Sequence, residues 1–261
     1  MPTVTLSDCT IFYVDEGQGS PLLFVHGFPL DHTMWRNQIE AFRASHRVIA
    51  VDLPGFGAST NPPTAMSIIG MADRLVEFLD RLKLAQVVLC GLSMGGSIAQ
   101  QFAVRHPSRL AGLILCDCRA MTDPPETQQF RHDLADRVLQ EGPEFVAQAM
   151  PARLFAPQTL TEQPAVVESI QAVIRATAPQ SVARGSRALA DREDMVPHLG
   201  RITVRTLLIV GSEDVISTVD EMRTIATRIP NSQLVEIAEA GHMAPLENPK
   251  VVNELLRNWI A

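Results

Sequence analysis

The chain reads Gly91-Leu92-Ser93-Met94-Gly95-Gly96 directly after the apolar run 85–90. Two glycines, each two positions from a serine, form the G-x-S-x-G pattern of a tight strand-to-helix turn, in which a neighbouring Cβ atom would collide with the turn. The alternative is an ordinary glycine-rich loop. A buried-strand pattern before the motif and a helical pattern after it favour the turn. We therefore expect Ser93 to stand on a nucleophile elbow, with Gly96 letting the following helix approach the strand closely.

Composition narrows the class of protein. The 261 residues are 46% hydrophobic, which suits one α/β domain with a large core. The net charge of −7, without a basic cluster, argues against nucleic acid or an anionic membrane surface as a partner. No apolar run approaches the ~20 residues that cross a bilayer, and residues 1–6 lack the features of a signal peptide. We expect a cytoplasmic protein that acts on a small molecule, and we leave its oligomeric state open, a homo-oligomer included.

Cysteine usage indicates neither a disulfide framework nor a metal site. Cys90 and Cys116 end apolar runs, so we interpret them as buried thiols. Cys116 and Cys118 are too close in sequence for a redox C-x-x-C pair, and no histidine cluster provides zinc ligands. We expect no metal and no cofactor.

The hydrophobic pattern predicts an α/β fold. Runs rich in Val, Ile and Leu alternate with helical patterns, and several runs are continuously apolar, as strands covered on both faces are. The expected strands are 3–6, 10–14, 21–25, 47–51, 86–90, 110–116, 204–210 and 233–237, and the first two form an antiparallel hairpin. The expected helices are 33–42, 67–82, 94–105, 218–228 and 249–259. This alternation predicts a mostly parallel, twisted, eight-stranded sheet flanked by helices, with ligands at the carboxyl ends of its strands.

One segment interrupts the alternation. Residues 119–200 show no clear strand, and frequent prolines divide them into four or so short amphipathic helices. A segment of this length with so many prolines makes a poor independent core. We therefore predict a helical lid, inserted after the sixth strand, over a core formed by residues 1–118 and 201–261.

A serine nucleophile requires a base, and the base requires an orienting carboxylate. His242 is the predicted base, because it lies in a Gly/Pro-rich loop between the last strand and the last helix. His26 follows the strand 21–25, but its neighbour Gly27 indicates that the backbone matters there rather than the imidazole. The remaining histidines are interpreted as surface or helix-end residues: His32, His46, His106, His132 and His198.

Asp214 is the predicted acid, since it follows the strand 204–210. Asp117, after the strand 110–116, is the alternative. Glu213 is expected to point away, and Asp52 is interpreted as a loop anchor. For the oxyanion of the tetrahedral intermediate, the expected donors are two backbone N–H groups, those of Phe28 and of Met94 at a helix N-terminus.

These motifs together resemble the α/β-hydrolase family. They are HGFP (26–29), DLPGFG (52–57), GLSMGG (91–96), GSED (211–214) and AGHMAPLENP (240–249), and the resemblance covers essentially the whole chain. Within the family the chain is similar to small bacterial carboxylesterases and to 3-oxoadipate enol-lactonases, the run 29–35 being lactonase-like. Pro29 stands where cofactor-free perhydrolases tend to carry a proline. Ser93 argues against dehalogenases and epoxide hydrolases, whose nucleophile is an aspartate.

The resemblance implies a carboxylesterase for small to medium esters first, a lactonase second and a perhydrolase third. An alternative from another class is a ligand receptor that uses the same fold without turnover. The substrate pocket is expected under the lid, and its candidate apolar residues are Phe130, Phe145, Leu154, Phe155, Val173, Ile174 and, outside the lid, Val215. The alternative for the lid residues is that they form the internal packing of the lid. An enol-lactonase needs a group that holds the substrate carboxylate, and the arginines of the lid are the candidates, with a solvated surface role as the alternative for each. They are Arg119, Arg131, Arg137, Arg153, Arg175, Arg184 and Arg187.

Overall fold

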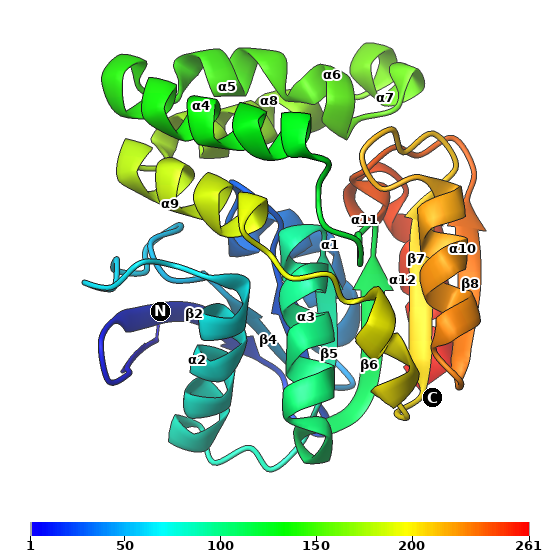
Figure 1. Cartoon of the computed structure of the whole chain (residues 1–261). Helices are drawn as coiled ribbons and strands as arrows, with labels where there is room; N and C mark the ends of the chain where they lie inside the picture. Colours follow the sequence, from blue (N-terminus) through cyan, green and yellow to red (C-terminus); the bar gives the residue numbers. More distant parts are fainter. Residues whose placement is uncertain (1, 261) are drawn as a thin grey trace.

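A single eight-stranded sheet runs through the centre of the computed structural model, which describes residues 2–260 (Figure 1). Its strands are β1 (Thr3–Thr5), β2 (Thr10–Glu16), β3 (Pro21–Val25), β4 (Arg47–Val51), β5 (Val87–Leu92), β6 (Leu110–Cys116), β7 (Thr206–Gly211) and β8 (Ser232–Ile237). Their spatial order is β1-β2-β4-β3-β5-β6-β7-β8. Strands β3 to β8 run parallel to one another. Strand β2 pairs antiparallel with both β1 and β4. The predicted mostly parallel, eight-stranded sheet is confirmed.

Helices cover both faces of the sheet because its central strands are apolar on both sides. On β3, Leu23 and Val25 pack in the core that contains α2 (Ile68–Arg81), α3 (Met94–Arg105) and α10 (Val219–Arg228). Leu22 and Phe24 alternate with them and pack in the core that contains α1 (Arg36–Phe42) and α12 (Pro249–Ile260). The two hydrophobic cores therefore lie on opposite faces of one sheet.

Six α-helices lie between β6 and β7, above the carboxyl edge of the sheet (Figure 1). They are α4 (Pro125–Glu141), α5 (Glu144–Ala149), α6 (Pro151–Leu154), α7 (Pro157–Glu162), α8 (Pro164–Ala176) and α9 (Pro179–Ala190). The sequence indicated only four or so. Five of the six begin on a proline and α5 follows one, because proline suits the first turn of a helix, where the missing N–H costs nothing. The prolines in this segment therefore start helices.

The remaining boundaries differ from expectation by a few residues. Strand β5 extends through Gly91 and Leu92, because these residues pair with Leu115 and Cys116 of β6. A 3-10 turn, His32–Trp35, replaces the first turn expected for α1. None of the helices in the described part of the chain is long and apolar enough to span a membrane.

Candidate active site

Ser93 occupies a strained turn between β5 and α3. Its φ of 54° and ψ of −112° lie outside the regions that residues other than glycine usually adopt. The turn leaves no room for side chains around it, since a Cβ atom on Gly91 would lie 2.2 Å from the Gly95 carbonyl oxygen, and one on Gly95 would lie 2.3 Å from that of Val25. The Ser93 N–H donates to the Cys116 carbonyl at 3.0 Å, which ties the turn to β6.

The structure brings Ser93, His242 and Asp214 into one hydrogen-bonded line. The His242 Nε2 atom lies 2.8 Å from the Ser93 Oγ atom, and the Nδ1 atom lies 2.8 Å from Asp214 Oδ2. Asp214 Oδ1 accepts from the N–H groups of Ile216 and Ser217 at 2.7 and 3.0 Å, which fixes the carboxylate. Because Nδ1 donates to a carboxylate, Nε2 is free to accept the serine proton.

The alternative acids lie elsewhere. Asp117 is fully buried, and its Oδ1 atom accepts from the Gly211 N–H at 2.8 Å. Its Oδ2 atom has no partner among the described residues. Burial raises the pKa of Asp117 well above its ordinary value, and the negative charge of Asp214 adds to that effect. Glu213 is exposed, so the carboxylate that meets the imidazole is that of Asp214.

Asp52 and His26 hold the neighbouring loops together. Asp52 accepts hydrogen bonds from the N–H groups of His32 and Ala58, both at 2.8 Å, as a loop anchor does. The buried His26 bonds the Gly27 carbonyl through Nδ1 at 2.8 Å and accepts from the Leu53 N–H through Nε2 at 2.9 Å. The imidazole of His26 therefore matters to the fold, which the interpretation from sequence missed.

Ligand-type atoms of Asp31, His32 and Asp52 lie within 4.8 Å of one another. Both Asp52 oxygens already accept hydrogen bonds, and Asp31 caps the turn through the Thr33 N–H. We interpret this group as part of the loop framework.

The expected oxyanion donors are placed beside the serine. Phe28 follows β3, Met94 is the first residue of α3, and both line the same cavity as Ser93. Among the described residues, neither N–H group donates to a protein acceptor. Both amides are therefore available to a bound ligand, and the Met94 amide lies at the positive end of the α3 dipole.

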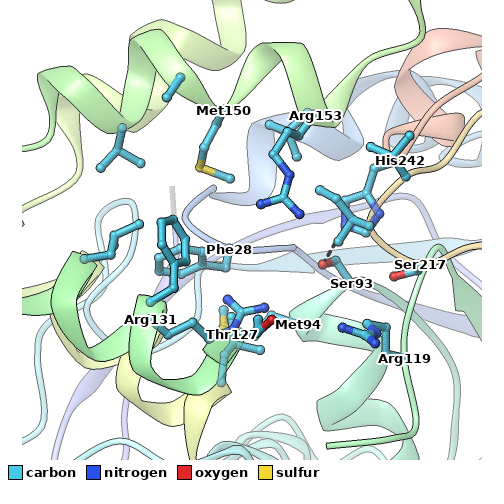
Figure 2. A pocket seen from close by; sticks show the side chains of 18 of the residues that line it. Phe28, Ser93, Met94, Arg119, Thr127, Arg131, Met150, Arg153, Ser217 and His242 are labelled. Atoms are coloured by element: carbon cyan, nitrogen blue, oxygen red, sulfur yellow. Dashed lines mark hydrogen bonds between the residues drawn. The ribbon is translucent and has the colours of Figure 1, made fainter. Parts of the chain in front are cut away.

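A cavity of about 680 Å³ lies between the serine and helices of the segment predicted as a lid, namely α4, α5, α6 and α9 (Figure 2). Of the residues expected to line it, Phe130, Phe145, Leu154 and Val215 do so. Phe155, Val173 and Ile174 are not among the lining residues. Phe155 is 4% exposed and packs in the core that contains α1 and α12, because α6 ends at Leu154 and the chain turns extended there.

Further lining residues were not singled out from the sequence. They include Leu134 of α4, Val146 of α5, Met150 before α6, Leu189 of α9 and Ser217. Apolar residues in short helices occur on buried and cavity-facing sides alike, so their helical spacing alone does not distinguish the two.

Five arginines line the cavity, and four of them have acidic partners within the protein. Asp123, which is buried, accepts hydrogen bonds from Arg119, Arg131 and Arg192. Burial acts to raise the pKa of Asp123, but these guanidinium groups outweigh it and hold that pKa below its usual range. Arg119 also pairs with Glu221.

The remaining two arginines of the lining differ from each other. Arg137 pairs with Glu141 and lies over the Phe145 ring. The Arg153 guanidinium forms no hydrogen bond or ion pair with any residue in the range 2–260, and Figure 2 shows it reaching from α6 toward Ser93 and His242. The arginines 175, 184 and 187 are not among the lining residues.

Known proteins are similar to this chain over most of its length. Residues 20–249 match the family model for the alpha/beta hydrolase fold. A 3-oxoadipate enol-lactonase from Acinetobacter baylyi is 30% identical over 253 residues, which cover 96% of this chain and 93% of the relative. A thermophilic esterase from Thermogutta terrifontis, solved with malate bound, superposes with a TM-score of 0.97 at 41% identity, covering 100% of this chain and 98% of that one. The enol-lactonase from Burkholderia xenovorans gives a TM-score of 0.93 at 26% identity, covering 99% of both chains.

Proposed function

The chain belongs to the α/β-hydrolase fold family, and we propose that it is a serine hydrolase that cleaves carboxylic esters through an acyl-enzyme on Ser93. The observation that carries this proposal is the line of hydrogen bonds from Asp214 through His242 to Ser93, at 2.8 Å in each step, at the base of a largely apolar cavity. Esterases and lactonases among the relatives support the same reaction class.

Acylation follows from this geometry. The Ser93 oxygen attacks the ester carbonyl carbon while His242 Nε2 takes the hydroxyl proton. Asp214 holds the imidazole in the required tautomer and stabilises the imidazolium. The amides of Phe28 and Met94 stabilise the oxyanion, and one such donor typically contributes roughly 100- to 1,000-fold to the rate.

Collapse of the tetrahedral intermediate completes the first half of the reaction. The imidazolium of His242 protonates the leaving alkoxide, which departs as an alcohol and leaves the acyl group on Ser93. His242 then deprotonates a water molecule, which attacks the acyl carbonyl. The acid leaves, and the proton returns from His242 to the serine oxygen.

The test is hydrolysis of p-nitrophenyl esters, from acetate to octanoate, together with several lactones. We expect Ser93→Ala to lower turnover roughly 10⁵-fold or more while the protein stays folded. Ser169→Ala, on α8 and outside the cavity, is the matched control and should keep the wild-type rate. A folded Ser93→Ala protein with wild-type activity would contradict the proposal. Binding of panel members without turnover by the wild type would favour the receptor alternative.

A specific feature of the cavity favours a lactonase with a carboxylate-bearing substrate as the second candidate. Arg153 faces the catalytic serine without an acidic partner, in a protein whose net charge is −7. A guanidinium group binds a carboxylate through two parallel hydrogen bonds. The malate in the related esterase structure is a dicarboxylate, and the enol-lactonase relatives favour a lactone.

Arg153→Gln tests this second candidate. Two lactones of matched shape are compared: 5-oxotetrahydrofuran-2-carboxylate, and γ-valerolactone, in which a methyl group replaces the carboxylate. Loss of the charged hydrogen bonds should lower kcat/KM roughly tenfold for the first lactone and leave the second unchanged. Arg175→Gln, whose arginine pairs with Glu144 outside the cavity, is the control. Equal effects on both lactones would reject a carboxylate subsite at Arg153.

A further inference from the structure

Glu247 is a buried carboxylate outside the Ser93–His242–Asp214 triad, and it joins the lid to the loop that carries His242. Glu247, the last residue of α11 (Ala244–Glu247), is 5% exposed. Its Oε1 atom accepts from the N–H groups of Gly241 and Met243 at 2.8 and 3.1 Å. Gly241 and Met243 are the residues on either side of His242. One oxygen of Glu247 therefore fixes the backbone that carries the catalytic imidazole.

The other oxygen of Glu247 binds only the lid. Its Oε2 atom accepts from the Ala156 N–H at 2.8 Å and from the Thr159 hydroxyl at 2.7 Å. Ala156 precedes α7 and Thr159 lies within it. Each oxygen of Glu247 thus accepts two hydrogen bonds, Oε1 from the His242 loop and Oε2 from the lid.

Close packing provides an independent link between the same two segments. A Cβ atom added to Gly241 would lie 2.7 Å from the Ala156 nitrogen and 2.9 Å from the Phe155 carbonyl carbon. The backbone of the His242 loop therefore rests directly on the backbone of the α6–α7 junction. Such contact between main chains leaves little freedom for one segment to shift without the other.

The docked segment also shapes the cavity. Arg153 and Leu154, which belong to α6 and line the cavity, immediately precede the residues that dock on the His242 loop. The position of α6 determines where these two side chains meet a substrate. Glu247 therefore fixes the position of α6 relative to His242, although it is not among the residues that line the cavity.

We propose that Glu247 is a positioning residue that couples the seating of the lid segment α6–α7 to the orientation of His242. This inference rests on the proposed role of His242 as the base. A carboxylate suits the position because both of its oxygens accept hydrogen bonds, whereas an amide of the same shape turns an NH₂ group toward donors on one side. Substrate contacts at α6 and proton transfer at His242 are then linked through a single side chain.

The principal test is Glu247→Gln, measured as kcat per folded molecule. A misplacement of the base by about 1 Å costs on the order of 100-fold, so we expect kcat to fall about 10- to 100-fold. The rate of inactivation by a p-nitrophenyl alkylphosphonate should fall by a similar factor, because that reaction also uses Ser93 and His242. Circular dichroism and thermal unfolding check that the variant is folded at the assay temperature.

Thr159→Ala tests the contact of Glu247 with the lid separately from its contact with the His242 loop, because it removes one hydrogen bond to Oε2 and none to Oε1. We expect KM to rise at least threefold for substrates that reach α6, with kcat within about threefold of wild type, and Thr159→Ser to restore KM. The matched control is Ser186→Ala, which removes a buried lid hydroxyl that donates to the Arg131 carbonyl at 2.8 Å and does not contact Glu247. It should leave both constants unchanged.

Specific outcomes overturn the inference. Wild-type kcat and phosphonate reactivity in folded Glu247→Gln would remove the coupling to His242. If that variant does not fold, Thr159→Ala decides, and kinetic constants equal to those of Ser186→Ala would overturn the link to the lid. The Ser93→Ala protein in the same assays keeps the two proposals apart, because a wild type without serine-dependent turnover contradicts the proposed function itself.

Discussion

Ser93 holds a backbone conformation that its surroundings must stabilise. A non-glycine residue in such a region costs roughly 1–3 kcal/mol. The pairing of β5 with β6, the bond from the Ser93 N–H to Cys116 and the close contact of Gly91 with Gly95 all restrict the turn. The strain is therefore localised at the residue that we propose as the nucleophile, whose hydroxyl must stand clear of the sheet.

Asp214 and Asp117 are both buried near His242, and we expect their substitution to have very different effects on kcat. In Asp214→Asn the one amide oxygen is needed by the N–H groups of Ile216 and Ser217, so an NH₂ group faces His242 Nδ1. The imidazole then adopts the wrong tautomer, and we expect kcat to fall on the order of 10⁴-fold, as the same change does in another triad. Asp117→Asn should keep kcat within about threefold, since Asp117 bonds the Gly211 N–H rather than His242. Steady-state kinetics of both variants make the comparison. The reverse order of effects would assign the acid to Asp117.

At the scale of elements, the sheet could be predicted closely from the sequence. Strands such as β3 and β4 coincide with their expected bounds, because a short, continuous apolar run is typical of a strand that is buried on both faces. Parallel strands bring their carboxyl ends to one edge, and for that reason Ser93, Asp214 and His242 were expected to meet although they are far apart in the sequence. The glycines around Ser93 marked the turn.

The lid could be predicted only in outline. Its prolines indicated breaks between helices, but the number of helices and their cavity-facing sides depend on packing that short sequence patterns do not determine. Phe130 is 55% exposed at the cavity, whereas Phe155 is buried in the core. The signal for Glu247 was also weak. Glu247 was not singled out from the sequence, although an acidic residue five positions after His242 in an otherwise apolar run is unusual.

At the scale of the whole molecule, four of the buried carboxylates fall into two groups. Burial acts to raise the pKa of Asp52 and of Asp123, but hydrogen bonds from His32 and from arginines outweigh it, so both pKa values are lowered. Asp117 and Glu247 have no cationic partner within hydrogen-bond distance, and burial raises their pKa values. The first group contributes stability that is lost as the pH falls, whereas the second contributes stability that is lost as the pH rises.

Asp117 provides a measurable case of the second group. Its pKa in the folded protein is raised well above the ordinary value of 3.8, chiefly by burial and then by the charge of Asp214. Between the unfolded and folded pKa values the folded state binds more protons, so the free energy of unfolding falls as the pH rises. Asp117→Asn keeps an acceptor for the Gly211 N–H but cannot ionise.

We therefore expect the free energy of unfolding of Asp117→Asn, minus that of the wild type, to become more positive from pH 4 to pH 8. Urea titrations at several pH values measure this difference. The amide adds donors to a site where Oδ2 has no partner among the described residues. This adds an offset that does not depend on pH, so only the change of the difference with pH is diagnostic. Asp214→Asn, measured in the same way, is the control for the charge that faces Asp117. A difference that stays constant, or that becomes more negative with rising pH, would show that Asp117 is ionised in the folded protein without a penalty.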